Sequence, residues 1–124
     1  MEDDNWWKYI KEEKNKYKKI GYIKCPAFSY EEIFFNYYGL NHLMYKNGIL
    51  RSRNEIKERF GILPHALNIL KRVRGVENEE KRVKDKSIAY FWTIKDTTNN
   101  QLRLRIIIRR LNNGTLHFFS IMRE

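Results

Sequence analysis

The chain has 124 residues, which is the length of one domain. Its 25 Lys and Arg residues outnumber 15 Asp and Glu residues, which gives a formal net charge of +10. That balance favours a polyanionic partner, with nucleic acid first and an anionic membrane surface second, over a merely soluble basic protein. Since 42% of the residues are hydrophobic, the chain can close a core, and disorder throughout is excluded.

The single cysteine, Cys25, excludes an internal disulfide and a cysteine zinc site, and it fits a reducing cytosol. The first residues, MEDDNWW, are acidic where a signal peptide is basic, and no apolar run reaches the length of a membrane span. We therefore expect a cytoplasmic protein without a membrane partner, although a toxin exported without a cleaved signal would have the same features.

The first element is an amphipathic helix over residues 5–19, with Trp6, Ile10 and Tyr17 at helical spacing. We treat residues 1–20 as an N-terminal helical extension and residues 21–124 as the main domain. Residues 22–25 predict a short extended segment, which the proline after it confines to an edge.

Three helical segments are expected next. The capping box Ser29-Tyr30-Glu31-Glu32 predicts a helix that ends near Gly39. Residues 39–48 have an apolar face at helical spacing, and on that helix His42 and Lys46 would point to one side, being four residues apart. A second capping box begins at Ser52 and opens a helix that we expect to be interrupted at Gly61 and to resume at Pro64.

The C-terminal half predicts strands. Residues 76–86 are nearly all charged and indicate an exposed loop. Residues 87–95 are apolar on both faces, which is typical of a central strand. Residues 101–122 predict a β-hairpin that turns at Asn113-Gly114, because Asn-Gly between apolar runs is the strongest short hairpin signal.

A two-residue loop at Asn113-Gly114 sets the register of this hairpin and opposes Ile106 to Ile121 and Ile107 to Ser120. A one-residue shift in the loop would exchange partners on one strand. One face then carries the core residues Leu104, Ile106, Ile108, Phe119 and Ile121. The other face carries Arg103, Arg105, Arg109, Phe118 and Ser120, which suits a phosphate backbone.

Helices followed by strands predict an α+β fold. We expect the N-terminal helices to pack on one face of a curved three- to four-stranded antiparallel sheet, a meander in which residues 22–25 supply the fourth strand.

The residue types present can cleave RNA without a metal, since a base, cations and a hydroxyl or amide donor suffice. Three histidines are available, His42, His65 and His117, and no acidic or cysteine cluster has metal-ligand spacing. Structural roles are equally open: His42 as a core-edge histidine, Lys46 as compensation for the helix dipole, and the strand arginines as a solvated face. We expect His65 to be a surface or packing residue and His117 to lie on the core face.

The order CPAF, a helix ending GLNHLMYKNG, a second helical pair and three strands closing on a serine resembles the phage-type barnase–EndoU–colicin–RelE nucleases over residues 22–123. The resemblance implies an α+β fold with a curved antiparallel sheet and metal-independent endoribonuclease activity. It places the catalytic residues at His42, Lys46 and Ser120, with the phosphate-gripping arginine at Arg105 or Arg109. A histidine is more usual at the position of Lys46, which leaves the division between acid and base open.

The sequence therefore predicts an endoribonuclease that uses no metal or cofactor, a toxin or phage-associated enzyme acting on RNA. The alternatives are a non-catalytic RNA- or DNA-binding module and a protein whose basic face meets an acidic antitoxin or immunity protein. The expected substrate-binding residues are Arg51, Arg53, Arg103, Arg109 and Phe118.

Overall fold

A computed structural model describes residues 2–124, with the side chain of residue 2 left out. Along these residues the helices are α1 (Glu2–Ile20), the 3-10 turn η1 (Pro26–Phe28), α2 (Tyr37–Met44) and α3 (Arg53–Arg72). The strands are β1 (Tyr22–Cys25), β2 (Glu31–Phe34), β3 (Tyr45–Lys46), β4 (Ile49–Leu50), β5 (Asn78–Lys84), β6 (Ser87–Thr97), β7 (Arg103–Leu111) and β8 (Leu116–Arg123). No helix among the described residues combines the length and apolar content needed to cross a bilayer.

The strands form a six-stranded sheet in the order β1-β2-β8-β7-β6-β5, while β3 and β4 pair separately. The strand β2 runs parallel to β8, pairing Ile33 with Leu116 and Phe34 with His117, and every other neighbouring pair is antiparallel. The chain is α+β, but the expected three- to four-stranded antiparallel meander is wrong. Two strands were absent from that expectation: β2 lies between β1 and β8, and β5 forms the edge beside β6.

The strand β2 lies where the first capping box predicted a helix. Ser29 and Tyr30 have positive φ angles of 55° and 64°, and this left-handed turn reverses the chain between β1 and β2. Pairing with β1 on one side and β8 on the other satisfies the backbone of β2 and buries Ile33 completely. Tertiary pairing thus outweighs the local capping preference.

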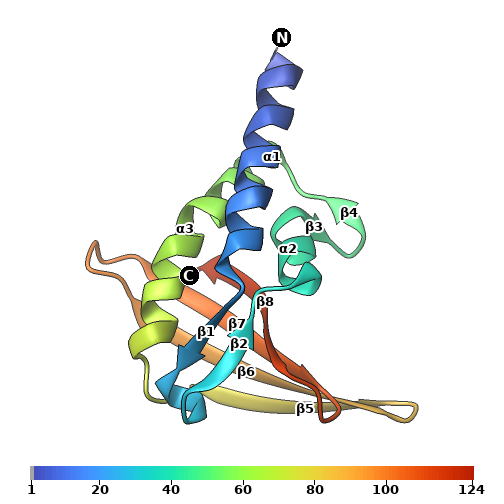
Figure 1. Cartoon of the computed structure of the whole chain (residues 1–124), viewed down its shortest axis with the longest axis vertical. Helices are drawn as coiled ribbons and strands as arrows, with labels where there is room; N and C mark the ends of the chain where they lie inside the picture. The colour runs from blue at the N-terminus through green and yellow to red at the C-terminus, as the bar shows by residue number, and fades with distance from the viewer. Residues whose placement is uncertain (1) are drawn as a thin grey trace.

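The strand β5 replaces the predicted charged loop at residues 76–86. All seven of its residues are exposed, and it pairs with β6 from Asn78–Thr93 to Lys84–Ser87. As an edge strand with no buried side chain, it shows no apolar alternation in the sequence. Figure 1 shows the β5–β6 hairpin extending away from the helices.

The second capping box is confirmed, because Ser52 Oγ accepts a hydrogen bond from the Glu55 amide at 3.2 Å. The helix that it opens is continuous, however, so the predicted interruption at Gly61 is wrong. Gly61 and Pro64 are exposed, while Phe60, Leu63 and Leu70 keep one stripe of α3 in the core. Burial along this stripe outweighs the local cost of glycine and proline.

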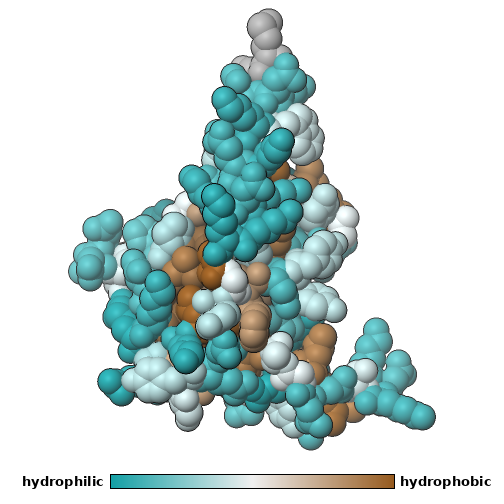
Figure 2. All heavy atoms as spheres, in the orientation of Figure 1, coloured by the Kyte–Doolittle hydropathy of each residue, from teal (hydrophilic) through white to brown (hydrophobic). Residues whose placement is uncertain are grey.

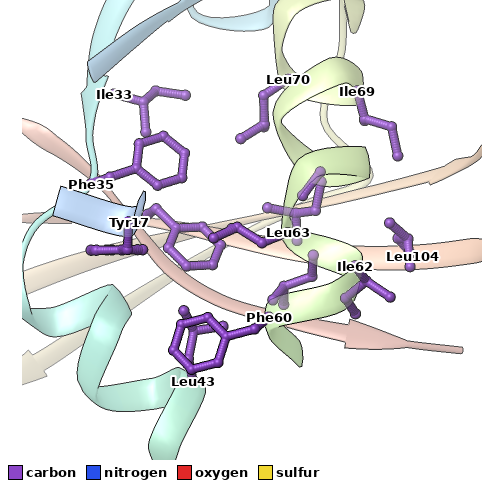
Figure 3. Packing of buried hydrophobic residues seen from close by; sticks show 14 of the residues in the cluster. Tyr17, Ile33, Phe35, Leu43, Phe60, Ile62, Leu63, Ile69, Leu70 and Leu104 are labelled. Carbon is purple, nitrogen blue, oxygen red and sulfur yellow. The ribbon is translucent and has the colours of Figure 1, made fainter. Parts of the chain in front are cut away.

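The core lies between the sheet and the helices: α3 packs across one face of the sheet, α2 packs against β8, and α1 projects away from the sheet with its C-terminal end in the core (Figure 1). Figure 3 shows Phe60 and Leu63 of α3 pointing toward Tyr17 of α1 and Leu43 of α2. The helix α1 adds Trp6 and Ile10 to this cluster and exposes its lysines, which agrees with the hydrophilic surface over α1 in Figure 2.

The hairpin of β7 and β8 has the predicted pairs Ile106–Ile121 and Ile107–Ser120, but its register shifts between Ile107 and Ile108. Beyond the shift Ile108 pairs with Phe118, so Phe118 faces the core and is 0% exposed. The prediction that Phe118 lies on the basic face and Phe119 on the core face is therefore wrong. One bulged residue exchanges the two rings.

Candidate functional site

The helix α2 places two side chains beside β8. Its N-cap Asn36 accepts a hydrogen bond from the Tyr38 amide at 3.2 Å, and its buried Leu43 faces the core. Tyr38 and His42 lie one helical turn apart and project from the same side of α2. The His42 ring lies over Phe119, with 4.0 Å between the ring centroids.

Arg109 of β7 lies between two of these rings. Its guanidinium carbon is 4.3 Å from the centroid of Phe119 and 4.5 Å from that of Tyr38. Its Nε donates a hydrogen bond to Nε2 of His117 at 2.9 Å, and His117 in turn stacks on Tyr38. Tyr38, His42, Arg109, His117 and Phe119 together form what we call the candidate site.

One atom of Arg109 is left without a partner. Its Nη2 is buried and makes no hydrogen bond within the described part of the chain. A buried guanidinium nitrogen in this state is unusual, because unpaired buried donors cost free energy. The guanidinium thus retains donor capacity that no described residue uses.

Both histidines of the site are neutral at pH 7. Burial lowers the pKa of His42, and the nearby positive charges of Arg51, Arg109 and Arg59 lower it further. Burial and Arg109 lower the pKa of His117 to about 4, although a hydrogen bond with the Thr115 backbone acts in the opposite direction. Since Nε2 of His117 accepts a hydrogen bond, its proton is assigned to Nδ1.

Two further arginines connect the helices and the strand around His42 through hydrogen bonds to backbone carbonyls. The Arg51 side chain is only 6% exposed, and its Nε donates to the His42 carbonyl at 3.0 Å. Arg59 of α3 donates from Nη1 to the carbonyl of Ile121 in β8. Arg51 thus ties the start of α3 to α2, and Arg59 ties α3 to β8.

Lys46 does not lie where the sequence placed it. The helix ends at Met44, because Tyr45 adopts an extended conformation with φ −126° and ψ 149°. Lys46 is exposed on β3, so its predicted position one helical turn after His42 is wrong. It lines a surface hollow together with Arg51.

The residues of β7 and β8 that the sequence assigned to the site do not all lie near His42. Ser120 pairs with Ile107 two residues from Arg109, and it is buried. Arg105 is four residues from Arg109 along β7, roughly 13 Å at strand spacing, and it forms an ion pair with Glu124 at 3.0 Å. Arg103 is exposed beyond it. Of the two arginines considered for gripping phosphate, only Arg109 accompanies His42.

Arg53 and His65 lie elsewhere. Arg53 forms an ion pair with Asp3 at 2.6 Å and lies 5.1 Å from the Trp6 ring, so it joins α1 to α3. His65 is about three turns further along α3, beside a hollow that it lines with Arg72. The structure therefore brings together His42, Arg51 and Arg109 and leaves these two apart.

Four residues of this region were absent from the predicted site: Tyr38, Arg59, His117 and Phe119. The sequence held a signal for Tyr38 alone, since it precedes His42 by four residues. His117 and Phe119 lie beside Arg109 because of the bulge in β8, which no sequence pattern indicated, so the prediction that His117 lies on the core face is wrong. Among the described residues, no three His, Cys, Asp or Glu side chains converge as a metal site.

Comparison with known proteins adds no relative. No family model matches the chain, and searches of curated proteins and of solved structures find no significant match either.

Proposed function

We propose that the protein is a metal-independent endoribonuclease that cleaves RNA by attack of the 2′-hydroxyl on the adjacent phosphate. The observation that supports the proposal is that the neutral imidazole of His42 and the guanidinium of Arg109 both lie against the Phe119 ring. The centroid of His42 and the guanidinium carbon of Arg109 both lie within 4.3 Å of the Phe119 centroid. A base and a phosphate-binding cation so close can act on one phosphodiester.

The roles follow from the state of each group. His42 is unprotonated at neutral pH, so it can remove the proton of the 2′-hydroxyl. Arg109 donates hydrogen bonds to the phosphate as negative charge develops there. The 2′-oxygen forms its bond to phosphorus, and the bond from phosphorus to the 5′-oxygen breaks.

The leaving 5′-oxygen needs a proton, and Tyr38 is the donor that we assign. His117 is unsuited, because its pKa is about 4 and its Nε2 already accepts from Arg109. The Tyr38 hydroxyl belongs to a ring that is 45% exposed, and the residue lies one turn from His42 on α2. Base and acid would then flank the phosphate from one helix, and the products are a 2′,3′-cyclic phosphate and a free 5′-hydroxyl.

The resemblance to barnase–EndoU–colicin–RelE nucleases supports the same chemistry, and we propose that the protein is a divergent member of that superfamily. We also propose that it is a toxin or phage-associated enzyme, that it acts in the cytoplasm and that an acidic antitoxin or immunity protein neutralises it. Such a partner would complement the net charge of +10.

The test is incubation of the protein with total RNA in EDTA. Wild type should cut the RNA, and His42→Ala should reduce the rate by at least about a hundredfold, as expected for loss of a general base. The matched control is His65→Ala, which removes an imidazole outside the site and should keep the rate. Undiminished cleavage by His42→Ala would contradict the proposed mechanism. Binding of RNA by the wild type without any cut product would favour the non-catalytic binding module.

A further inference from the structure

The candidate site continues as a row of side chains across the sheet. Phe119 stands on β8, Arg109 on β7, Phe91 on β6 and Arg82 on β5, one residue from each of four neighbouring strands. The rings of Phe119 and Phe91 meet edge to face with centroids 5.3 Å apart. The guanidinium carbon of Arg82 lies 4.4 Å from the Phe91 centroid. Three strand spacings make the row about 14 Å long.

This row lies on the face of the sheet opposite α3, which we call the open face. Strand pairing places Phe91 opposite Arg109, so both point away from the core residues Ile94, Ile106 and Ile108. Phe91 and Phe119 are half-buried, and Arg82 has 61% of its side chain exposed. The exposed parts of Phe91 and Arg82 are available to a ligand, whereas His42 and Arg109 already lie against the Phe119 ring.

Arg82 is suited to stacking more than to binding phosphate. Glu80 accepts two hydrogen bonds from it, at 2.9 Å from Nε and 3.1 Å from Nη2, and this fork fixes the guanidinium plane. The carboxylate also neutralises the positive charge, which weakens attraction for a phosphate. A fixed guanidinium plane resting on an aromatic ring is a surface on which a nucleobase stacks.

We propose that Arg82 and Phe91 form a stacking subsite for unpaired bases of a single-stranded RNA whose scissile phosphate lies at Arg109. The inference rests on the proposed function and names its substrate class. Aromatic rings exposed on a β-sheet can stack unpaired bases, and the net charge of +10 complements the backbone of the nucleic acid. Duplex RNA keeps its bases stacked on one another and could not use this row.

The test uses a fluorescent single-stranded DNA of about eight nucleotides, within the site size of such surfaces. This probe lacks the 2′-hydroxyl and cannot be cut by the proposed reaction. Fluorescence anisotropy should show that Arg82→Ala weakens binding about tenfold, as expected for one lost stacking contact. Arg82→Lys keeps the charge but loses the plane, so it should weaken binding to a similar degree.

The matched control is Lys81→Ala. Lys81 is the neighbouring cation on β5, but it faces the other side of the strand, 6.0 Å from the Tyr90 ring. Its removal should leave affinity near that of the wild type. Equal losses in Arg82→Ala and Lys81→Ala, wild-type binding by Arg82→Lys, or equally tight binding of a duplex of the same length would each overturn the subsite.

The stacking subsite and the nuclease activity can fail independently in these experiments. Because the probe cannot be cut, its binding and the cleavage of RNA are measured in separate assays. If RNA is never cleaved while Arg82→Ala still weakens binding, the nuclease fails and the stacking subsite stands. If RNA is cleaved while both Arg82 variants bind as the wild type, the subsite fails and the nuclease stands.

Discussion

Arg109 Nε donates a hydrogen bond to Nε2 of His117 at 2.9 Å in a place from which water is nearly excluded, since His117 is 3% exposed. The pKa of His117 is about 4, against an ordinary value of 6.5. Between these values the unfolded chain binds a proton that the folded chain does not, so lowering the pH through this window reduces the free energy of unfolding. The loss from this residue amounts to at most about 3 kcal/mol.

Urea denaturation between pH 7 and pH 4 measures that loss. Gln can still accept the Arg109 hydrogen bond but does not titrate, so His117→Gln should show a smaller decline than the wild type. An identical decline in both proteins would mean that His117 does not titrate as the geometry requires.

The charge of Arg51 helps to keep the pKa of His42 low. After burial, the positive charge of Arg51 has the largest effect among those that lower the pKa of His42. Removing the charge in Arg51→Gln should raise that pKa, because the imidazolium is then less strongly repelled. NMR titration of the His42 ring measures it, and the acid limb of the cleavage profile should move to higher pH. Arg53→Gln is the control; a shift of equal size there would point to a general charge effect.

Tyr38→Phe tests the assignment of the proton donor. Phe keeps the ring against Arg109 and His117 but lacks the hydroxyl, so substrate affinity should persist while kcat falls by about a hundredfold. Single-turnover assays separate the two quantities. A substrate with a better leaving group should recover most of the lost rate, and no recovery would argue that Tyr38 acts only by packing.

Gly39 fixes how closely α2 approaches β8. A Cβ at this position would lie 2.7 Å from the Phe118 carbonyl oxygen and would also overlap the Phe118 ring and the Tyr17 hydroxyl. Gly39→Ala should therefore cost about 1–3 kcal/mol of stability. Gly61→Ala is the matched control, because nothing lies within 4 Å of its Cβ and the change should stabilise α3 by about 0.5–1 kcal/mol. Thermal denaturation of the two variants should move in opposite directions.

The bulge in β8 predicts different roles for two adjacent phenylalanines. Phe118 is fully buried, so Phe118→Ala should destabilise the protein by about 3–5 kcal/mol. Phe119 is half-buried on the open face, so Phe119→Ala should cost less stability and chiefly weaken oligonucleotide binding. Chemical denaturation and anisotropy measure the two effects, and the reverse order of stability losses would contradict the observed register.

Local signals predicted the parts of the fold that local interactions determine. Asn113-Gly114 marked the hairpin, although its loop spans residues 112–115 and not two residues, and Ser52 with Glu55 marked the start of α3. The strand β2 could not be predicted because its pairing with β8 joins residues more than eighty positions apart, against a capping pattern that favours a helix. His42 and Arg109 were both candidates from residue type. Their meeting at Phe119 depends on a bulge that changes which side of β8 each ring faces.

The parallel contact between β2 and β8 has a consequence for how the protein matures during translation. His42 is synthesised well before Phe119, which lies on β8. Until β8 has left the ribosome, α2 has no strand to rest on and the imidazole has no guanidinium beside it. Under the proposed function, a nascent chain that still lacks β8 should therefore not cleave RNA.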